Sequence, residues 1–179
     1  MKNFNKLFIC TAVVLPLFLT CVKAENVASD RQALRGIERI GVQIGEISPV
    51  ATEKGVNRKY LRRNIESKLR SEGIYVVSHD ELENNSEIPY LLITVLLSYN
   101  EPTYSYVLML GLNEKVHMIR DPKIISYAIP WWRIMKGEHL GNIGLVKEVD
   151  KTLRQLLNEF SRDYFAVNSP ETSIQPGEK

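Results

Sequence analysis

Beyond residue 24 this sequence has no cysteine. Its two cysteines, Cys10 and Cys21, both lie in the apolar segment near the start of the chain. A protein that begins after this segment therefore has no disulfide, no thiol nucleophile and no cysteine ligand for a metal. Such a chain is compatible with an oxidising compartment, although it does not use the chemistry of that compartment.

The sequence also lacks the recognisable motifs of catalysis and cofactor binding. It contains no G-x-S-x-G, S-x-x-K or H-E-x-x-H motif, and no glycine pattern for binding a phosphate or a dinucleotide. Its histidines, His79, His117 and His139, do not have the spacing of metal ligands. We therefore expect no metal, no cofactor and no catalytic residue, and an enzyme with a scattered site is only the third hypothesis for function.

The first 24 residues have the three parts of an export signal. Lys2 and Lys6 precede an apolar run at residues 7–22, and Ala24 is a small residue of the kind that signal peptidase accepts. A membrane-spanning helix needs about 20 apolar residues, which is more than this run offers. We therefore expect cleavage between Ala24 and Glu25 and an exported protein, periplasmic or secreted, with no transmembrane helix in its mature chain.

Cys21 raises the alternative of a lipid anchor. Bacterial lipoprotein signals usually have leucine three residues before the cysteine and glycine, alanine or serine directly before it. This chain has Phe18 and Thr20 at those positions. One acylated cysteine would convert a soluble protein into an anchored one, but the two departures favour removal of the whole segment.

Once the signal is removed, basic residues no longer outnumber acidic residues. The first 24 residues hold three lysines and no acidic residue. The remaining chain has 20 Lys and Arg against 21 Asp and Glu, a formal charge of −1 where the full sequence has +2. A nucleic-acid-binding domain is usually basic, so we expect no nucleic-acid partner.

Hydrophobic periodicity predicts a single α+β domain. Apolar residues alternate in residues 37–47 and recur every fourth residue at Leu61, Ile65 and Leu69. We predict strands at residues 37–47, 74–77, 90–99, 104–119 and 123–132, and helices at 54–70 and from about 146 to 167. Asn142 is the predicted N-cap of the last helix, residues 78–88 a loop, and residues 137–144 a glycine-rich loop.

This order, β-α-β-β-β-β-α, predicts a two-layer sandwich. Its sheet has four to five mostly antiparallel strands, with both helices on one face. We place the domain at residues 37–167, with a lead-in at 25–36 and a disordered tail at 168–179.

The predicted strands carry more apolar side chains than one covered face requires. A sheet covered on one side should alternate apolar and polar residues, yet apolar residues occur at both parities of two strands, and two adjacent tryptophans point to opposite faces. Either loops or a helix cover the second face, or that face is an interface. The candidate interface residues are Leu92, Leu96, Val107, Met109, Trp131 and Trp132.

The first predicted helix has a basic side. Lys59, Arg63 and Arg70 fall together opposite its apolar stripe. These residues could form an anion-facing surface for lipid head groups. Alternatively, they are the solvated back of a helix, with Glu66 placed to pair with Arg62 and Arg70.

Five segments taken in order resemble a widespread family of short exported bacterial proteins without an assigned function. They are ESKLRSEGI, YLLITVLLSY, the RDP turn, a tryptophan before a glycine loop, and FSRDYFAVN. The resemblance covers residues 37–168 and departs at Trp131-Trp132-Arg133, where the family pattern has one tryptophan beside a threonine.

The element order is similar, more distantly, to that of small envelope adaptor domains. These include the lipopolysaccharide-assembly lipoprotein and the N-terminal domains of curli-secretion and translocation proteins. The resemblance implies binding rather than catalysis. Our hypothesis is an envelope binding or scaffold protein that acts through an apolar sheet face or edge, with an envelope protein or a second copy as partner. The alternative is a carrier of a lipid or other apolar ligand between the sheet and the helices.

Overall fold

The structure is a computed structural model that describes residues 30–169. The predicted export signal, with Cys21 and the Ala24–Glu25 cleavage site, lies outside the described residues, and so do residues 170–179 of the predicted tail. In the described part the elements are β1 (Gly41–Ile47), α2 (Pro49–Glu53), α3 (Arg58–Ser71), α4 (His79–Asn84), β2 (Tyr90–Asn100), β3 (Thr103–Met118), β4 (Asp121–Leu140) and α5 (Leu145–Asn168).

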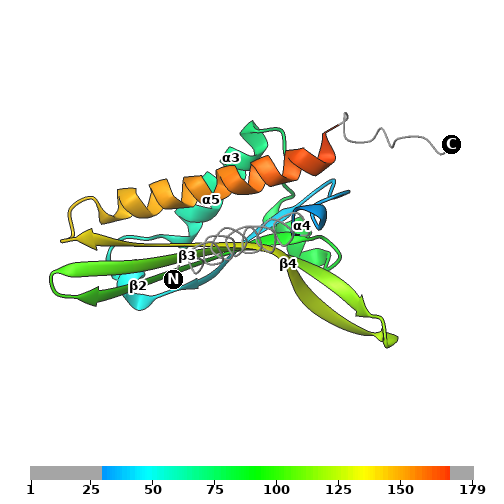
Figure 1. The fold of residues 1–179 in the computed structure, drawn as a ribbon, viewed down its shortest axis with the longest axis horizontal. Helices are drawn as coiled ribbons and strands as arrows, with labels where there is room; N and C mark the ends of the chain where they lie inside the picture. The colour runs from blue at the N-terminus through cyan, green and yellow to red at the C-terminus, as the bar shows by residue number, and fades with distance from the viewer. Residues whose placement is uncertain (1–29, 170–179) are drawn as a thin grey trace, which may run out of the picture.

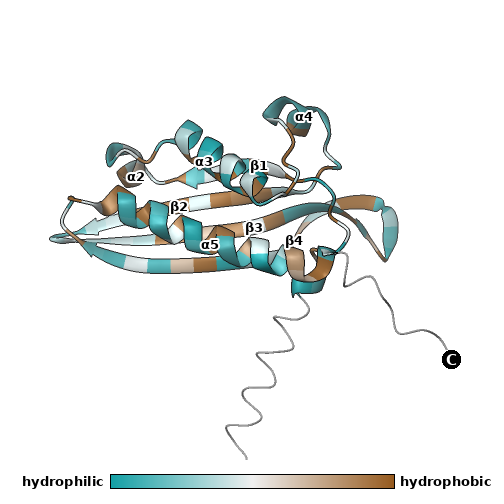
Figure 2. Ribbon diagram, turned by 90° about the horizontal axis from the view of Figure 1, so that it is seen from above, coloured by the Kyte–Doolittle hydropathy of each residue, from teal (hydrophilic) through white to brown (hydrophobic). Residues whose placement is uncertain are grey.

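The four strands form one sheet in the order β1-β2-β3-β4. β1 pairs with β2 in parallel through a crossover that contains α3, and the other two pairings are antiparallel. α3 and α5 lie on the same side of this sheet (Figure 1), and α5 follows its length (Figure 2). The predicted α+β sandwich is therefore confirmed, with a mixed sheet.

The core lies between this sheet and the two helices. Alternate residues of β2 and β3 point toward the helices and are buried, as are the residues that repeat at three or four positions on α3 and α5. Among its fully buried members are Leu91, Ile93, Leu108, Leu110, Trp131, Ile65, Leu69, Leu156 and Phe160. The alternating residues of the strands and the repeating residues of the helices thus pack together in one core layer.

Two elements between residues 74 and 88 differ from the prediction. The strand predicted at 74–77 makes one isolated bridge, between Ile40 and Val76, at the start of the free edge of β1, and does not form a strand of the sheet. The loop predicted at 78–88 contains α4. The side chain of Ser78 caps α4 by accepting the backbone N–H of Glu81, and Ser-x-x-Glu is a sequence signature of a helix start that the chain already displayed.

The ends of three elements also differ from the prediction. α3 begins at Arg58, after the capping side chain of Asn57, and not at Lys54. α5 begins after Gly144, which has a left-handed φ of 85°, so Asn142 is not its cap. The expected glycine loop begins later, since Gly137 lies inside β4: the Tyr106 ring packs against it where a Cβ atom would stand.

β3 and β4 continue beyond the other strands as a two-stranded arm, residues 114–128. A register shift between Leu112 and Glu114 marks its base, and Pro130 lies in β4 close to the same point. Bulges bend a ribbon, and in Figure 1 the arm projects away from the helices, toward the opposite side of the sheet.

The folded unit begins earlier and ends later than predicted. Leu34, which we assigned to the lead-in, has no exposed surface. Asn168, which we assigned to the tail, accepts the backbone N–H of Gly36 at 2.8 Å and donates to the carbonyl of Leu34 at 2.8 Å. These bonds fasten the start of the described chain to the end of α5. Within residues 30–169 no helix is both long and apolar enough to cross a membrane.

Candidate binding surfaces

The sheet has an open face on the side away from α3 and α5. We define the open face by three rows of residues that the pairing register sets side by side on β2, β3 and β4. The rows are Leu92–Gly111–Trp132, Thr94–Met109–Ile134 and Leu96–Val107–Lys136. Seven of these nine residues are apolar or glycine, so the open face is a mainly apolar surface three strands wide.

Side chains on the open face are only partly covered. Leu96 is 37% exposed, Trp132 49% and Ile134 47%, while Leu92, Val107 and Met109 are half-buried. If loops or a further helix covered the second face, these side chains would be buried. Among the described residues α4 and the loop after it reach the margin of this side, where Leu82 packs on Gly41 of β1 and the segment lines a hollow with Gln43, Tyr90 and Tyr127.

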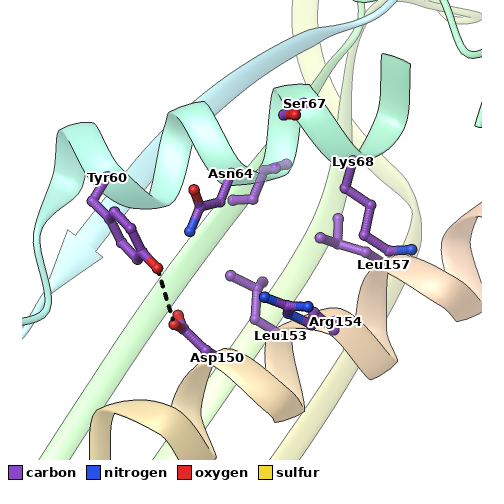
Figure 3. A pocket seen from close by; sticks show the side chains of 9 residues that line it. Tyr60, Asn64, Ser67, Lys68, Asp150, Leu153, Arg154 and Leu157 are labelled. Atoms are coloured by element: carbon purple, nitrogen blue, oxygen red, sulfur yellow. Dashed lines mark hydrogen bonds between the residues drawn. The ribbon is translucent and has the colours of Figure 1, made fainter. Parts of the chain in front are cut away.

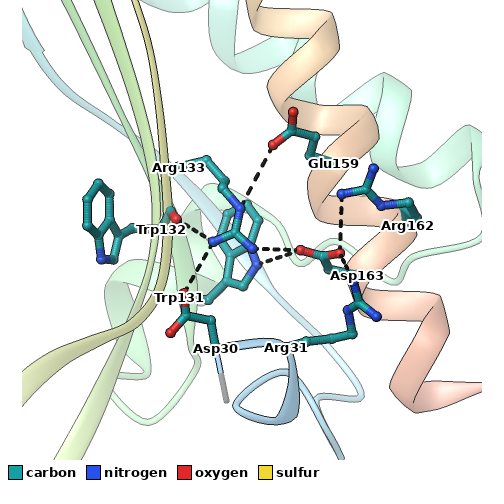
Figure 4. Close-up of polar contacts among 8 residues, drawn as sticks. All are labelled: Asp30, Arg31, Trp131, Trp132, Arg133, Glu159, Arg162 and Asp163. Carbon is teal, nitrogen blue, oxygen red and sulfur yellow. Dashed lines mark hydrogen bonds and ion pairs between the residues drawn. The ribbon is translucent and has the colours of Figure 1, made fainter. Parts of the chain in front are cut away.

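Trp131 does not belong to the candidate interface. It has no exposed surface, and its ring contacts Phe160 edge-on with centroids 5.2 Å apart. Its neighbour Trp132 points to the other side of β4 (Figure 4). The pleat of a strand sends adjacent side chains to opposite faces, so one tryptophan builds the core and the other the surface.

The free edge of β4 is poorly suited to pairing with another strand. Pro122 and Pro130 offer no backbone N–H, and the register shift at the base of the arm disturbs a regular edge. The opposite edge, β1, is short, and the bridge to Val76 covers its start. The sequence pointed to either a sheet face or a strand edge as the binding surface. The open face is therefore the better candidate of the two.

The space between the sheet and the helices is filled by core side chains. A cleft of about 290 Å³ lies near it, between the outer sides of α3 and α5. Figure 3 shows that polar groups surround it, with the Tyr60 hydroxyl 3.4 Å from an Asp150 carboxylate oxygen. The lining mixes these polar groups with Ile65, Leu153 and Leu157, so it is not the mainly apolar pocket that a lipid carrier needs.

The carboxyl group of Asp150, which lines this cleft, has a raised pKa. Its burial raises the pKa of the carboxyl group above the ordinary value, and Arg154 and the Tyr60 hydroxyl lower it in part. Burial disfavours the charged form, whereas a nearby cation and a donated hydrogen bond favour it. The net direction is a carboxyl group that is harder to ionise than in water.

A second hollow, of about 520 Å³, is strongly basic. We call it the basic hollow; it lies between one flank of α3 and the start of α4. Its lining residues are Asn57, Lys59, Tyr60, Arg62, Arg63, Glu66, Arg70, Ser78 and His79. The three residues that the sequence placed on an anion-facing surface, Lys59, Arg63 and Arg70, thus line one hollow, together with two that it did not include, Arg62 and His79.

A buried carboxylate, Asp163, organises the far end of the sheet (Figure 4). It has no exposed surface and accepts the indole N–H of Trp131 at 3.2 Å. Arg133 contacts it at 2.9 Å, Arg31 at 3.2 Å and Arg162 at 3.5 Å. Arg133 also reaches two more acidic residues, Asp30 and Glu159, at 3.4 and 3.8 Å.

This cluster balances three arginines against three carboxylates, so a charge that would be costly to bury alone is paired and hydrogen-bonded. It ties β4, α5 and the start of the described chain together. Its arrangement points to a structural role. The sequence offered one signal for it, the arginine that directly follows the two tryptophans in Trp131-Trp132-Arg133.

Each histidine contacts a group that is close to it in the chain. His79 lies 3.0 Å from the Glu83 carboxylate, and His117 and His139 each hydrogen-bond a backbone carbonyl within five residues. Among residues 30–169 no group of histidine and acidic side chains has the geometry of a metal site.

Comparison of the chain with models of known protein families gives no match, and no curated protein matches it significantly. Its function is therefore argued from its surfaces.

Proposed function

We propose that this chain is an exported scaffold protein that works by protein–protein association through its open face, and that the first occupant of this face is a second copy of the chain. The observation that carries the proposal is the set of half-exposed apolar side chains around Trp132. Aromatic residues at the centre of an apolar patch supply much of the binding energy at interfaces.

The charges on the open face favour a protein over an anionic membrane. Lys136 belongs to the open face, and Glu138, two residues further along β4, points to the same side in the next row. Their charges cancel, so the face has no net attraction for acidic head groups. In a two-fold arrangement, Lys136 of one copy can lie opposite Glu138 of the other, which makes the face complementary to itself.

The size of the open face sets the expected affinity. Three strands spaced about 4.8 Å apart and about five residues long at about 3.3 Å each cover roughly 240 Å² of flat area. Standard interfaces bury about 800 Å² on each partner, and weak ones less. Since side-chain relief and the arm add area, we expect a reversible dimer in the micromolar range rather than an obligate one.

Sedimentation velocity tests the proposal. The full chain would be expressed with its own N-terminal segment, purified in the form that the cells accumulate, and measured from about 1 to about 300 μM, the range in which a micromolar dimer dissociates. We expect a shift from monomer to dimer with concentration. A monomer throughout this range would overturn the proposal.

Two surface variants and a matched control locate the interface. Trp132→Ser and Ile134→Ser should each weaken the dimer at least ten-fold, which corresponds to about 1.4 kcal/mol. Tyr75→Ser removes an exposed aromatic residue, 61% exposed, away from the open face, and should leave the dimer intact. A dimer that resists both open-face variants would show that another surface is used.

A further inference from the structure

We propose that the basic hollow is a binding site for a phosphate group, independent of the open face. The basic hollow lies in the crossover between β1 and β2, where one flank of α3 faces the start of α4. Its ligand is either a phospholipid head group or a soluble phosphorylated molecule, and the chemistry that recognises the phosphate is the same in both cases.

The two flanks of α3, on either side of its buried stripe, carry different kinds of side chains. Leu61, Ile65 and Leu69 are buried against the sheet. At 100° per residue, one flank carries Asn64, Ser67 and Lys68, which border the cleft with α5. The other flank carries Lys59, Arg62, Arg63, Glu66 and Arg70, which all line the basic hollow.

Most of the positive charge in the hollow has no counter-charge. Arg70 pairs with Glu66 at 3.2 Å and donates to the carbonyl of Val76. Within residues 30–169, Lys59, Arg62 and Arg63 make no ion pair of 4 Å or less. Three cations side by side repel one another, so a bound anion would relieve the repulsion.

Two side chains of the lining hold a buried nitrogen without a partner. They are Nε of Arg62 and Nδ1 of His79, which make no hydrogen bond with any of the described residues. Burying a polar group without a hydrogen bond costs free energy. A small movement of either side chain toward an anion would recover this cost.

The donor set of the hollow fits a phosphate group. Two guanidinium groups and a lysine provide several N–H donors in a space of about 520 Å³, which exceeds the volume of one phosphate group. Guanidinium groups bind phosphate oxygens in a bidentate manner. Glu66 also lines the hollow, and its charge is held by Arg70, so the local balance stays positive.

The test has two arms that separate the two sources of phosphate. Isothermal titration with inorganic pyrophosphate reports a soluble ligand. Co-sedimentation with vesicles of phosphatidylglycerol in phosphatidylcholine, against vesicles of phosphatidylcholine alone, reports a head group. Both arms run at low and at physiological salt, because contacts between exposed charges are screened. The chain from residue 25 has a net charge of −1, so attraction must come from a local cluster.

The decisive variant is Arg62→Gln with Arg63→Gln, which removes two charges from the hollow. We expect at least a ten-fold loss of affinity for whichever probe binds. The matched control is Arg35→Gln with Lys147→Gln, which removes two exposed charges elsewhere and should bind like the unchanged protein. Trp132→Ser should also bind normally, because the open face is on the other side of the sheet.

Binding of pyrophosphate alone assigns the site to soluble phosphorylated molecules, and binding of the acidic vesicles alone assigns it to head groups. The proposal is overturned if neither probe binds at low salt, or if the control pair weakens binding as much as the hollow pair.

Discussion

Trp131 and Trp132 are adjacent in the chain but belong to different parts of the molecule. Trp131 is fully buried and donates its indole N–H to Asp163 at 3.2 Å, whereas Trp132 is 49% exposed on the open face. One peptide unit therefore joins the core to the proposed interface. Substitutions at these two positions should separate stability from association.

The first prediction concerns this pair. Trp131→Ala should lower the free energy of unfolding by about 3–5 kcal/mol, since it removes a large core side chain and leaves a cavity. Trp132→Ser should lower it by less than about 1 kcal/mol in the monomer, because half of that side chain is already in water. Urea unfolding at a concentration below that of dimer formation measures both. Equal losses would contradict the assignment of the two tryptophans to different layers.

The second prediction concerns the buried carboxylate. Asp163→Ala should destabilise the protein by about 3–5 kcal/mol, because it leaves the guanidinium group of Arg133 partly buried without its main counter-charge. It should also release the segment around Arg31 to proteolysis. Arg162→Ala is the control: this side chain is 66% exposed and 3.5 Å away, so its loss should cost less than about 1 kcal/mol. Limited proteolysis and urea unfolding give the two readouts.

The third prediction is a pH dependence at Asp150. Burial raises the pKa of this carboxyl group in the folded state, so the folded protein binds its proton more tightly than the unfolded chain does. The stabilisation that this proton provides is present below the unfolded pKa of about 3.9 and is lost as pH rises through the folded pKa.

Asp150→Asn should therefore be more stable than the unchanged protein at about pH 7, and the difference should shrink as pH falls toward about 4. The asparagine can still accept the hydrogen bond from Tyr60. Urea midpoints across this pH range provide the measurement, and a difference that grows toward acid would show the opposite sign of the shift.

The fourth prediction concerns export. Expression of the full chain in a bacterium should yield a periplasmic or secreted protein that begins at Glu25, as read from its intact mass. Replacing the small residue at the cleavage site, Ala24→Tyr, should leave a larger, membrane-associated form. Cys21→Ser should change neither the mass of the mature protein nor its location, and a loss of membrane attachment in this variant would instead support a lipid anchor.

Several features followed from local sequence alone. The period of two in β2 and the period of about 3.6 in α3 and α5 come from the geometry of each element, so they predicted the α+β sandwich and its core stripe. The same periodicity placed Lys59, Arg63 and Arg70 on one side of α3. The cap at Ser78 was also present in the sequence, although we interpreted that segment as a loop.

Other features depend on which segments meet in space. The pleat predicted that Trp131 and Trp132 face opposite ways, but only the packing of α5 decided which of them is buried. Likewise, His79 joins the α3 arginines, and Asp163 meets Arg31, across intervals of chain that no local pattern spans. Periodicity shows which residues share a face of an element, because dihedral angles repeat locally. Which faces are covered depends on crossovers and helix packing, which are properties of the whole chain.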